Sequence, residues 1–162
     1  MGGEIAQNEE WRHDGSVDWH LLENPEHAGV QGLVRALNSA YRGEPALWEQ
    51  DFDWPGFRWI DPNDADQSVL SFIRIPLTDD RIIACIANLT PMVRYDHRVG
   101  LPKPGRWVAI LNTDSTEFGG SGVLVGDINA EAIGWNDLEY SATLTLPPLG
   151  VVWLAHEQGP LT

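Results

Sequence analysis

Two apolar runs separated by a short polar break constrain the fold of this chain most strongly. The runs cover Ser68–Ile75 and Arg81–Leu89, and both are rich in β-branched and aromatic residues over the length of a strand. Both alternating faces of the second run are apolar, as in a strand that is covered on two sides. Pro76 cannot donate to a strand ladder, and Asp79 and Asp80 favour a turn. The pattern therefore predicts a β-hairpin in the middle of a sheet.

The rest of the chain after residue 56 is a series of short strands with turn signals between them. In Tyr140–Leu146 small or apolar residues alternate with polar ones, which is typical of a strand with one buried face. Such a series predicts an antiparallel β-sandwich over residues 57–156. Residues 113–129 are interpreted as a long flexible loop and residues 157–162 as a disordered tail. The predicted strands outside the hairpin are Phe57–Asp61, Tyr95–Gly100, Gly105–Asn112, Glu131–Gly134, Tyr140–Leu146 and Gly150–Ala155.

A single amphipathic helix is predicted before the strands, over residues 25–42. Asn24 is a good N-cap, Pro25 is favoured at the first helical position, and Gly43 follows the last turn. Between these residues, apolar side chains recur at intervals of three and four, which indicates one face of a helix. Residues 1–22 are predicted to be loop and turn, and residues 44–56 a connection to the sheet. The apolar stripe consists of Val30, Leu33, Val34, Leu37 and Tyr41.

Charge and composition narrow the classes of function. Ten Lys and Arg residues against 24 Asp and Glu give a formal net charge of −14, so nucleic acids and anionic membranes should repel the chain. Neutral partners such as sugars remain open, and the eight tryptophans suit either sugar stacking or the anchoring of a core or interface. No apolar run approaches the roughly 18 residues of a membrane span.

The single cysteine and the N-terminal sequence bear on the compartment. Cys85 has no partner for an internal disulfide, and its apolar strand predicts a buried, unreactive thiol. Met1–Trp11 has neither the basic region nor the apolar core of a secretory signal. A cytoplasmic location is therefore expected.

No motif in the sequence predicts a catalytic or metal centre. Asp61–Asp66 has the oxygen-rich start of a calcium loop but lacks its Gly and Glu positions, so it is interpreted as a solvated turn. Gly119–Val123 lacks the last glycine of a nucleophile elbow. The carboxylates are numerous, but their spacing selects no glycosidase pair. Neither a metal nor a cofactor is expected, since the histidines show no metal-binding spacing. They are His13, His20, His27, His97 and His156.

Motifs spread over nearly the whole chain, up to about His156, resemble the 1,4-α-glucan (glycogen) branching enzymes. The most specific combination is EW…DGSVDWHLL near the start with NDADQSVLSF around residue 67. The matching segments are Met1–Gln7, Glu10–Trp11, Asp14, Asp18–Leu22, His27–Arg42, Pro45–Leu47, Asp51–Phe52, Gly56–Phe57, Trp59–Asp61, Asp64, Ser68–Phe72, Asn88–Pro91, Leu111–Asp114, Gly119–Gly122 and Leu144–Leu149.

The resemblance implies a fold and a division of the chain. Residues 1–43 would be the end of a (β/α)₈ barrel, a loop and its last helix. Residues 44–56 would be a connection, and residues 57–156 a Greek-key β-sandwich of the α-amylase C-terminal type. The family's catalytic Asp nucleophile, Glu general acid and stabilising Asp would lie upstream, so the chain alone is expected to be inactive. The residues near the family's active-site mouth would be Glu4, Gln7, Glu10, Trp11, Asp14 and Asp18.

Two hypotheses about function follow. In the first, the chain is the C-terminal portion of a branching enzyme of glycogen biosynthesis, and its partner is the missing barrel portion. In the second, it is a stand-alone glucan-binding or scaffolding domain, with weak stacking of α-glucan on Trp48, Trp54 or Trp59. In either case the apolar stripe of the helix at 25–42 must leave water. Three outcomes are open: the helix folds back on the sandwich, it pairs with its copy in another chain, or it frays. Of these, a two-fold homodimer through the helix is favoured.

Overall fold

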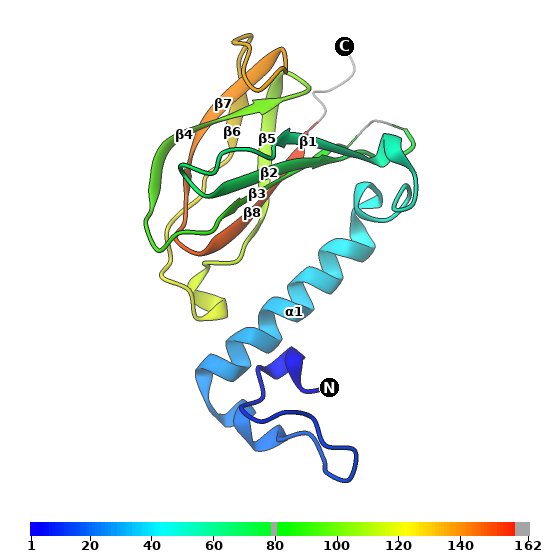
Figure 1. Ribbon diagram of the computed structural model, residues 1–162, viewed down its shortest axis with the longest axis vertical. Helices are drawn as coiled ribbons and strands as arrows, with labels where there is room; N and C mark the ends of the chain where they lie inside the picture. The colour runs from blue at the N-terminus through cyan, green and yellow to red at the C-terminus, as the bar shows by residue number, and fades with distance from the viewer. Residues whose placement is uncertain (79–80, 158–162) are drawn as a thin grey trace.

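The computed structural model describes residues 1–78 and 81–157, which form one α-helix and two antiparallel β-sheets (Figure 1). The larger sheet has six strands in the order β1-β2-β3-β8-β5-β6, and the smaller sheet pairs β4 with β7. Strands far apart in the sequence are thus neighbours, as Greek-key connections require. The strands are β1 Phe57–Asp61, β2 Val69–Arg74, β3 Ile83–Asn88, β4 Arg94–Leu101, β5 Gly105–Asn112, β6 Ile128–Ala130, β7 Tyr140–Leu146 and β8 Gly150–His156. The predicted mainly-β fold with one leading helix is confirmed.

One predicted strand is misplaced. The weak strand expected at Glu131–Gly134 is replaced by β6, which pairs with β5 three residues earlier in the chain. Ala130 is buried in the core, whereas Ile133 is 45% exposed. Pairing with β5 therefore selects the earlier segment. The predicted turn at Asp79 and Asp80 and the tail after Glu157 lie outside the described residues.

The main core lies between the two sheets. Trp107 of β5 is fully buried there, and its indole Nε1 donates to the carbonyl oxygen of Lys103 at 3.2 Å. Burying an aromatic side chain of this size dominates the energetics of a small core. The buried members of the cluster are Ile60, Val69, Ile73, Ile82, Ala84, Ile86, Val99, Leu101, Trp107, Ala130, Leu138, Ala142, Leu144, Leu146, Val152 and Leu154.

The outer face of the larger sheet is also covered in part. Ile83 and Cys85 of β3 pack with Ala155 of β8 against Ala46 and Leu47, two residues that follow the helix. The central strand β3 is therefore apolar on both sides, as its sequence predicted. Burial raises the pKa of the Cys85 thiol to about 12, so the thiol is protonated at neutral pH. The prediction of a buried cysteine is confirmed.

The helix α1 spans Pro25–Gly43 and begins as the sequence predicts, because the Asn24 side chain accepts a hydrogen bond from the Glu26 amide. It runs away from the sandwich like an arm, with the N-terminal segment at its far end (Figure 1). That segment contains two short 3₁₀ turns, η1 Gly3–Ile5 and η2 Trp19–Glu23. Ile5 is fully buried, and its carbonyl oxygen lies 2.8 Å from His27 Nδ1, which ties η1 to the helix.

The helix meets the sandwich through small residues. A Cβ on Gly29 would come within 2.7 Å of the carbonyl oxygen of Phe118, and Gly32 faces the Phe118 ring. Phe118 ends the 3₁₀ turn η5, Thr116–Phe118, which follows β5. Ala36 continues this face of the helix and lines a hollow with β5 residues. The small-residue face lies roughly 120° around the helix from the centre of the apolar stripe, so the stripe is not the surface that holds α1 on the sandwich.

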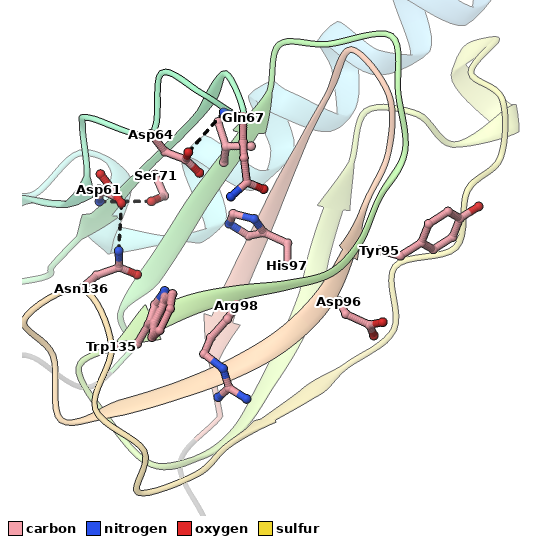
Figure 2. Close-up of a pocket in the computed structure, with 11 residues that line it drawn as sticks. Asp61, Asp64, Gln67, Ser71, Tyr95, Asp96, His97, Arg98, Trp135 and Asn136 are labelled. Carbon is pink, nitrogen blue, oxygen red and sulfur yellow. Dashed lines mark hydrogen bonds between the residues drawn. The ribbon is translucent and has the colours of Figure 1, made fainter.

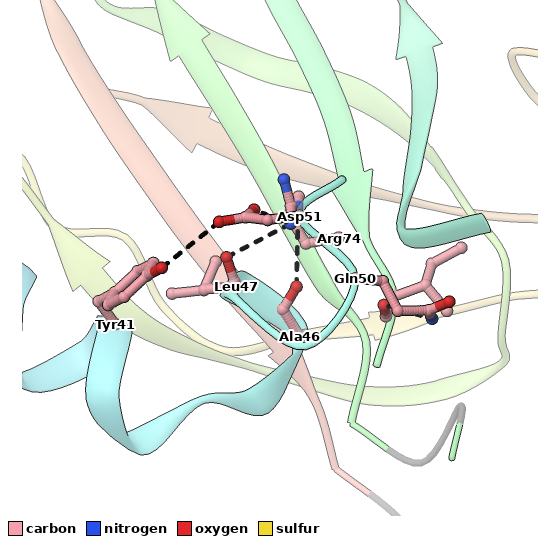
Figure 3. A network of polar contacts seen from close by, with 7 residues as sticks. Tyr41, Ala46, Leu47, Gln50, Asp51 and Arg74 are labelled. Atoms are coloured by element: carbon pink, nitrogen blue, oxygen red, sulfur yellow. Dashed lines mark hydrogen bonds and ion pairs between the residues drawn. The ribbon is translucent and has the colours of Figure 1, made fainter. Parts of the chain in front are cut away.

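A polar network holds the C-terminal end of the helix to β2 (Figure 3). Arg74 donates to the carbonyl oxygens of Ala46 and Leu47, both at 3.3 Å, and forms an ion pair with Asp51. The other Asp51 oxygen accepts a hydrogen bond from the Tyr41 hydroxyl at 3.4 Å. The connection after α1 is thus anchored to the end of β2 by one arginine.

The glycine-rich loop after β5 is held by one buried carboxylate. Asp114 accepts hydrogen bonds from the Ser121 amide and hydroxyl, both at 2.8 Å, and from the Val123 amide at 3.0 Å. Burial alone would raise the pKa of Asp114, but the hydrogen bonds from Ser121 and Val123 outweigh it and lower that pKa. The loop that contains η5 therefore has a fixed path where the sequence indicated flexibility.

Candidate functional site

Four of the six residues predicted near an active-site mouth come together in the N-terminal segment. Gln7, Glu10, Trp11 and Asp18 line a hollow of about 10 Å³. Gln7 organises this hollow, because its side chain accepts from the Asp18 amide at 3.1 Å and donates to the Glu9 carbonyl oxygen at 3.0 Å. The hollow has room for about one water molecule, so these residues present an open surface rather than a formed sugar site.

The other two predicted residues, Glu4 and Asp14, are exposed and do not line this hollow. Trp11 is exposed on one side of it. Carboxylates and an indole on an open surface can contribute to a site that another part of a protein completes. Their contact with substrate stays a prediction.

The three tryptophans predicted to stack on glucan have different surroundings. Trp59 packs edge-on against Phe57, with ring centroids 4.9 Å apart, and is 46% exposed. Trp54 is 90% exposed and lines a shallow hollow of about 240 Å³ with Phe52 and Phe57. Trp48 does not line this hollow. Trp54 is therefore the most accessible of the three rings to a ligand.

Sequence reasoning missed a larger pocket on the sandwich, of about 420 Å³ (Figure 2). It lies where the end of β1 and the following loop face β4 and the turn after β6. Asp61, which was interpreted as part of a solvated turn, binds across the pocket to Asn136, whose amide donates to Asp61 Oδ2 at 2.9 Å. The residues that line the pocket are Asp61, Asp64, Gln67, Val69, Ser71, Tyr95, Asp96, His97, Arg98, Trp135 and Asn136.

The described residues bear on two other kinds of site. They include no group of three or more His, Cys, Asp or Glu side chains placed to hold a metal ion. They also include no helix with the length and hydropathy of a membrane-spanning segment.

The fold and its family define the class of protein. Residues 59–157 match the alpha amylase C-terminal all-beta domain. The chain belongs to this family, and the two antiparallel sheets of Figure 1 agree with an all-beta domain.

Similarity to individual proteins extends beyond the sandwich and includes the helix and N-terminal segment. The chain is 50% identical over 158 residues to the 1,4-alpha-glucan branching enzyme GlgB of Aquifex aeolicus, which covers 97% of this chain and 25% of that enzyme. It is 46% identical to GlgB of Rubrobacter xylanophilus and 48% identical to GlgB of Myxococcus xanthus, covering 95% and 94% of this chain and 21% of each enzyme. The chain is thus homologous to the C-terminal region of these enzymes and spans a fifth to a quarter of their length.

Proposed function

We propose that this chain works as the C-terminal region of a 1,4-α-glucan branching enzyme. The observation that carries the proposal is the 50% identity to such an enzyme over 97% of the chain, from the N-terminal segment through the sandwich. The reaction cleaves an α-1,4 bond through a covalent glycosyl intermediate and transfers the chain to a 6-hydroxyl. This role implies a part in glycogen biosynthesis and a cytoplasmic location. The cytoplasm is reducing, which agrees with a cysteine that forms no disulfide, Cys85.

In the enzyme, this region has a structural role and the remainder carries out catalysis. The catalytic carboxylates belong to the part of the relatives that this chain does not match. Residues 1–43 complete the catalytic barrel, and the sandwich at 57–156 supports them. Gln7, Trp11 and Asp18 then stand at the rim of the active site, in the open arrangement described above.

The surface that receives the barrel is the apolar stripe of α1. The stripe is half-buried from Val30 to Leu37 and ends at Tyr41, which is exposed. Each apolar side chain of this size contributes about 1.5–3 kcal/mol when it is fully buried. A stripe that the sandwich leaves uncovered is suited to a partner that covers it, and in the enzyme that partner is the barrel.

Complementation tests the proposal directly. The segment of the Aquifex aeolicus enzyme that precedes the matching region is expressed with this chain, and branching of amylose is followed by the iodine spectrum and branch content. Neither part alone is expected to branch, and the two together are expected to regain activity. Activity of this chain alone that survives repurification, or no activity from the pair despite a stable complex, would refute the proposal.

A matched pair of variants tests the interface. Leu33→Glu with Leu37→Glu places two charges on the stripe and should abolish complementation. Leu77→Glu with Leu124→Glu adds the same charge at side chains that are 71% and 88% exposed on the sandwich, and should leave complementation intact. Equal loss in both variants would attribute the effect to net charge rather than to the stripe.

A second candidate function is that of a stand-alone glucan-binding or scaffolding domain. The exposed pair Phe52 and Trp54 favours it, because free aromatic faces on a polar surface suit the stacking of pyranose rings. A single stacked ring supports a Kd near 1 mM, about −4 kcal/mol. Titration with maltoheptaose, read from tryptophan fluorescence, tests it. If Trp54→Ala leaves the response unchanged, this second function loses its support.

A further inference from the structure

One wall of the pocket at Trp135 and His97 is a hydrogen-bonded turn that packs against β4. Trp135 and Leu138 exchange two backbone hydrogen bonds, both of 3.0 Å, across a two-residue turn. The central residues of that turn, Asn136 and Asp137, have φ of +51° and +56°, as a type I′ turn requires. The turn also packs closely on β4, because a Cβ on Gly100 would lie 2.3 Å from the Trp135 carbonyl oxygen.

Asn136 fixes the turn against the opposite wall. Its Oδ1 accepts from the Gly100 amide at 3.0 Å, while its Nδ2 donates to Asp61. The second Asp61 oxygen accepts from the Asn63 amide at 2.9 Å. Both walls are thus held by hydrogen bonds between backbone and side chain, and the cost of ordering the site on binding is small.

The pocket contains polar groups with hydrogen-bonding capacity to spare. His97 points from β4 toward the loop that carries Asp64 and Gln67 (Figure 2), and its ring takes part in no hydrogen bond within residues 1–78 and 81–157. Burial lowers the pKa of His97, partly against the opposing pull of Asp64, so the ring is neutral at pH 7. A neutral imidazole offers one donor and one acceptor, the combination that a sugar hydroxyl also presents.

The remaining lining excludes several classes of ligand. Asp61, Asp64 and Asp96 outnumber Arg98, so the pocket disfavours anions, in line with the charge of the whole chain. No metal-binding group of side chains is present in the described residues. An uncharged ligand with many hydroxyls fits a wall of carboxylates, amides and one imidazole.

Trp135 supplies the apolar element of the site. Its side chain is 48% exposed at the rim, so one part of the indole is held by the turn and another faces the pocket. The volume of about 420 Å³ lies within the range of small-molecule pockets. An indole beside a polar wall suits a pyranose ring, which can stack one face on the indole while its hydroxyls form hydrogen bonds with the polar wall.

We propose that this pocket binds a short segment of a neutral oligosaccharide, with a pyranose face on Trp135 and hydroxyls on His97, Asp64 and Asp61. The choice of an α-1,4-glucan among such sugars rests on the proposed function. The site is separate from the aromatic surface at Trp54 and from the hollow at Gln7. It would hold a glucan chain on the β-sandwich, away from the reacting bond.

The indole resonances of the unmodified chain provide the test. Each of the eight tryptophans gives one Nε1–H signal, which is assigned by substitution. Maltoheptaose is titrated to about 20 mM, well above the millimolar Kd that one stacked ring supports. The Trp135 signal is expected to shift and saturate while the signal of Trp19, which is 54% exposed in the N-terminal segment, stays in place. Because this readout uses the intact chain, it does not depend on whether a variant folds.

Matched variants sharpen the result. Trp135→Ala should weaken binding about tenfold, and Trp19→Ala, at a side chain that is 54% exposed in the N-terminal segment, should leave it unchanged. A shift confined to Trp54, or no shift at Trp135, would overturn the proposal. An equal response to cellohexaose would overturn the choice of an α-1,4-glucan. The assay measures binding and not branching, so its failure leaves the outcome of the complementation experiment untouched.

Discussion

The β-sandwich and the N-terminal arm (residues 1–43) differ in how far their apolar side chains are buried. The sandwich buries its large residues between two sheets, and Trp107 and Leu154 there are fully enclosed. In the arm, the buried residues are Gly2, Ile5 and Gly29, and the large apolar residues of the helix are only half-covered. The sandwich therefore supplies its own folding free energy, whereas the arm depends on what lies against it.

The contact between the two regions uses only one face of the helix and leaves a second face for the barrel of the proposed enzyme. Gly29 and Gly32 let the helix approach η5 closely on one side. The apolar stripe lies on another side, where it is only half-buried. A helix that used its stripe to hold the sandwich would have nothing left for a barrel. The division of one helix into a small-residue face and an apolar face is the physical basis of the proposed role.

The largest expected effect comes from removing a core ring. Trp107→Ala should lower the free energy of unfolding by about 3–5 kcal/mol, because it leaves a cavity between the sheets. Leu37→Ala on the half-covered stripe should cost at most about 1 kcal/mol. Urea unfolding followed by circular dichroism gives both values. If both variants lower the free energy of unfolding by similar amounts, the arm and the sandwich share one core, and the contrast between them is wrong.

The next effect concerns the loop that carries η5 to the helix. Asp114→Ala leaves the amides of Ser121 and Val123 without their acceptor, at a cost of about 1–3 kcal/mol. Ser121→Ala is the control, since it removes one hydroxyl donor and keeps the carboxylate. Hydrogen exchange of residues 116–123 should report local opening in the first variant. An unchanged exchange pattern would show that the loop is held by other contacts.

The pH dependence of this effect has a definite sign. The pKa of Asp114 is lowered in the folded chain, so its contribution is fully present above the unfolded pKa of about 3.9. It is lost as the pH falls through the folded pKa. The stability difference between the wild-type chain and Asp114→Asn should therefore be larger at neutral pH than in strong acid. A difference that grows on acidification would contradict the hydrogen-bonding account.

Local patterns were sufficient to predict most of the fold. Caps and three- and four-residue spacing located the helix, and alternation with turn residues located the strands of the hairpin and of Tyr140–Leu146. Glu131–Gly134 failed because Ile133 is apolar but exposed, and pairing with β5, a tertiary fact, decides which segment becomes the strand. The helix contact was missed for a similar reason: large residues indicated the packing face, while Gly29 and Gly32 form it.

The pocket could not be predicted from the sequence, because its members come from distant segments. Asp61 and Asn136 are hydrogen-bonded although 75 positions separate them. His97 enters from a third segment, aimed by an irregularity in β4 between Arg94 and His97. The local sequence offered one signal, because Asn136 and Asp137 are residues that favour a turn. That signal predicts the turn but not the segments that the turn packs against. The N-terminal site residues, in contrast, are close in sequence: all six were expected together, and four of them line one hollow.

An effect of similar size tests the contact between arm and sandwich. Gly→Ala inside a helix normally stabilises by about 1 kcal/mol, but Gly29→Ala should destabilise by about 1–3 kcal/mol because its Cβ meets the Phe118 carbonyl. Gly43→Ala, with no atom within 4 Å of its Cβ, is the matched control and should stabilise slightly. Thermal unfolding and hydrogen exchange of the helix amides check both. Stabilisation by Gly29→Ala would show that the helix is not seated on η5.

The smallest effect on stability, and the most direct test of what the arm lacks, concerns self-association. Without a barrel, the stripe from Val30 to Tyr41 is expected to pair with its copy in a two-fold dimer, since that burial removes apolar area from water. Leu33→Glu with Leu37→Glu should give a monomer by light scattering, with the signals of the sandwich unchanged. Adding the preceding segment of the Aquifex aeolicus enzyme should also dissolve the dimer, because both partners compete for one stripe. If the wild-type chain is already monomeric and its helix amides are protected from exchange, the helix packs on the sandwich of its own chain and the dimer prediction is wrong.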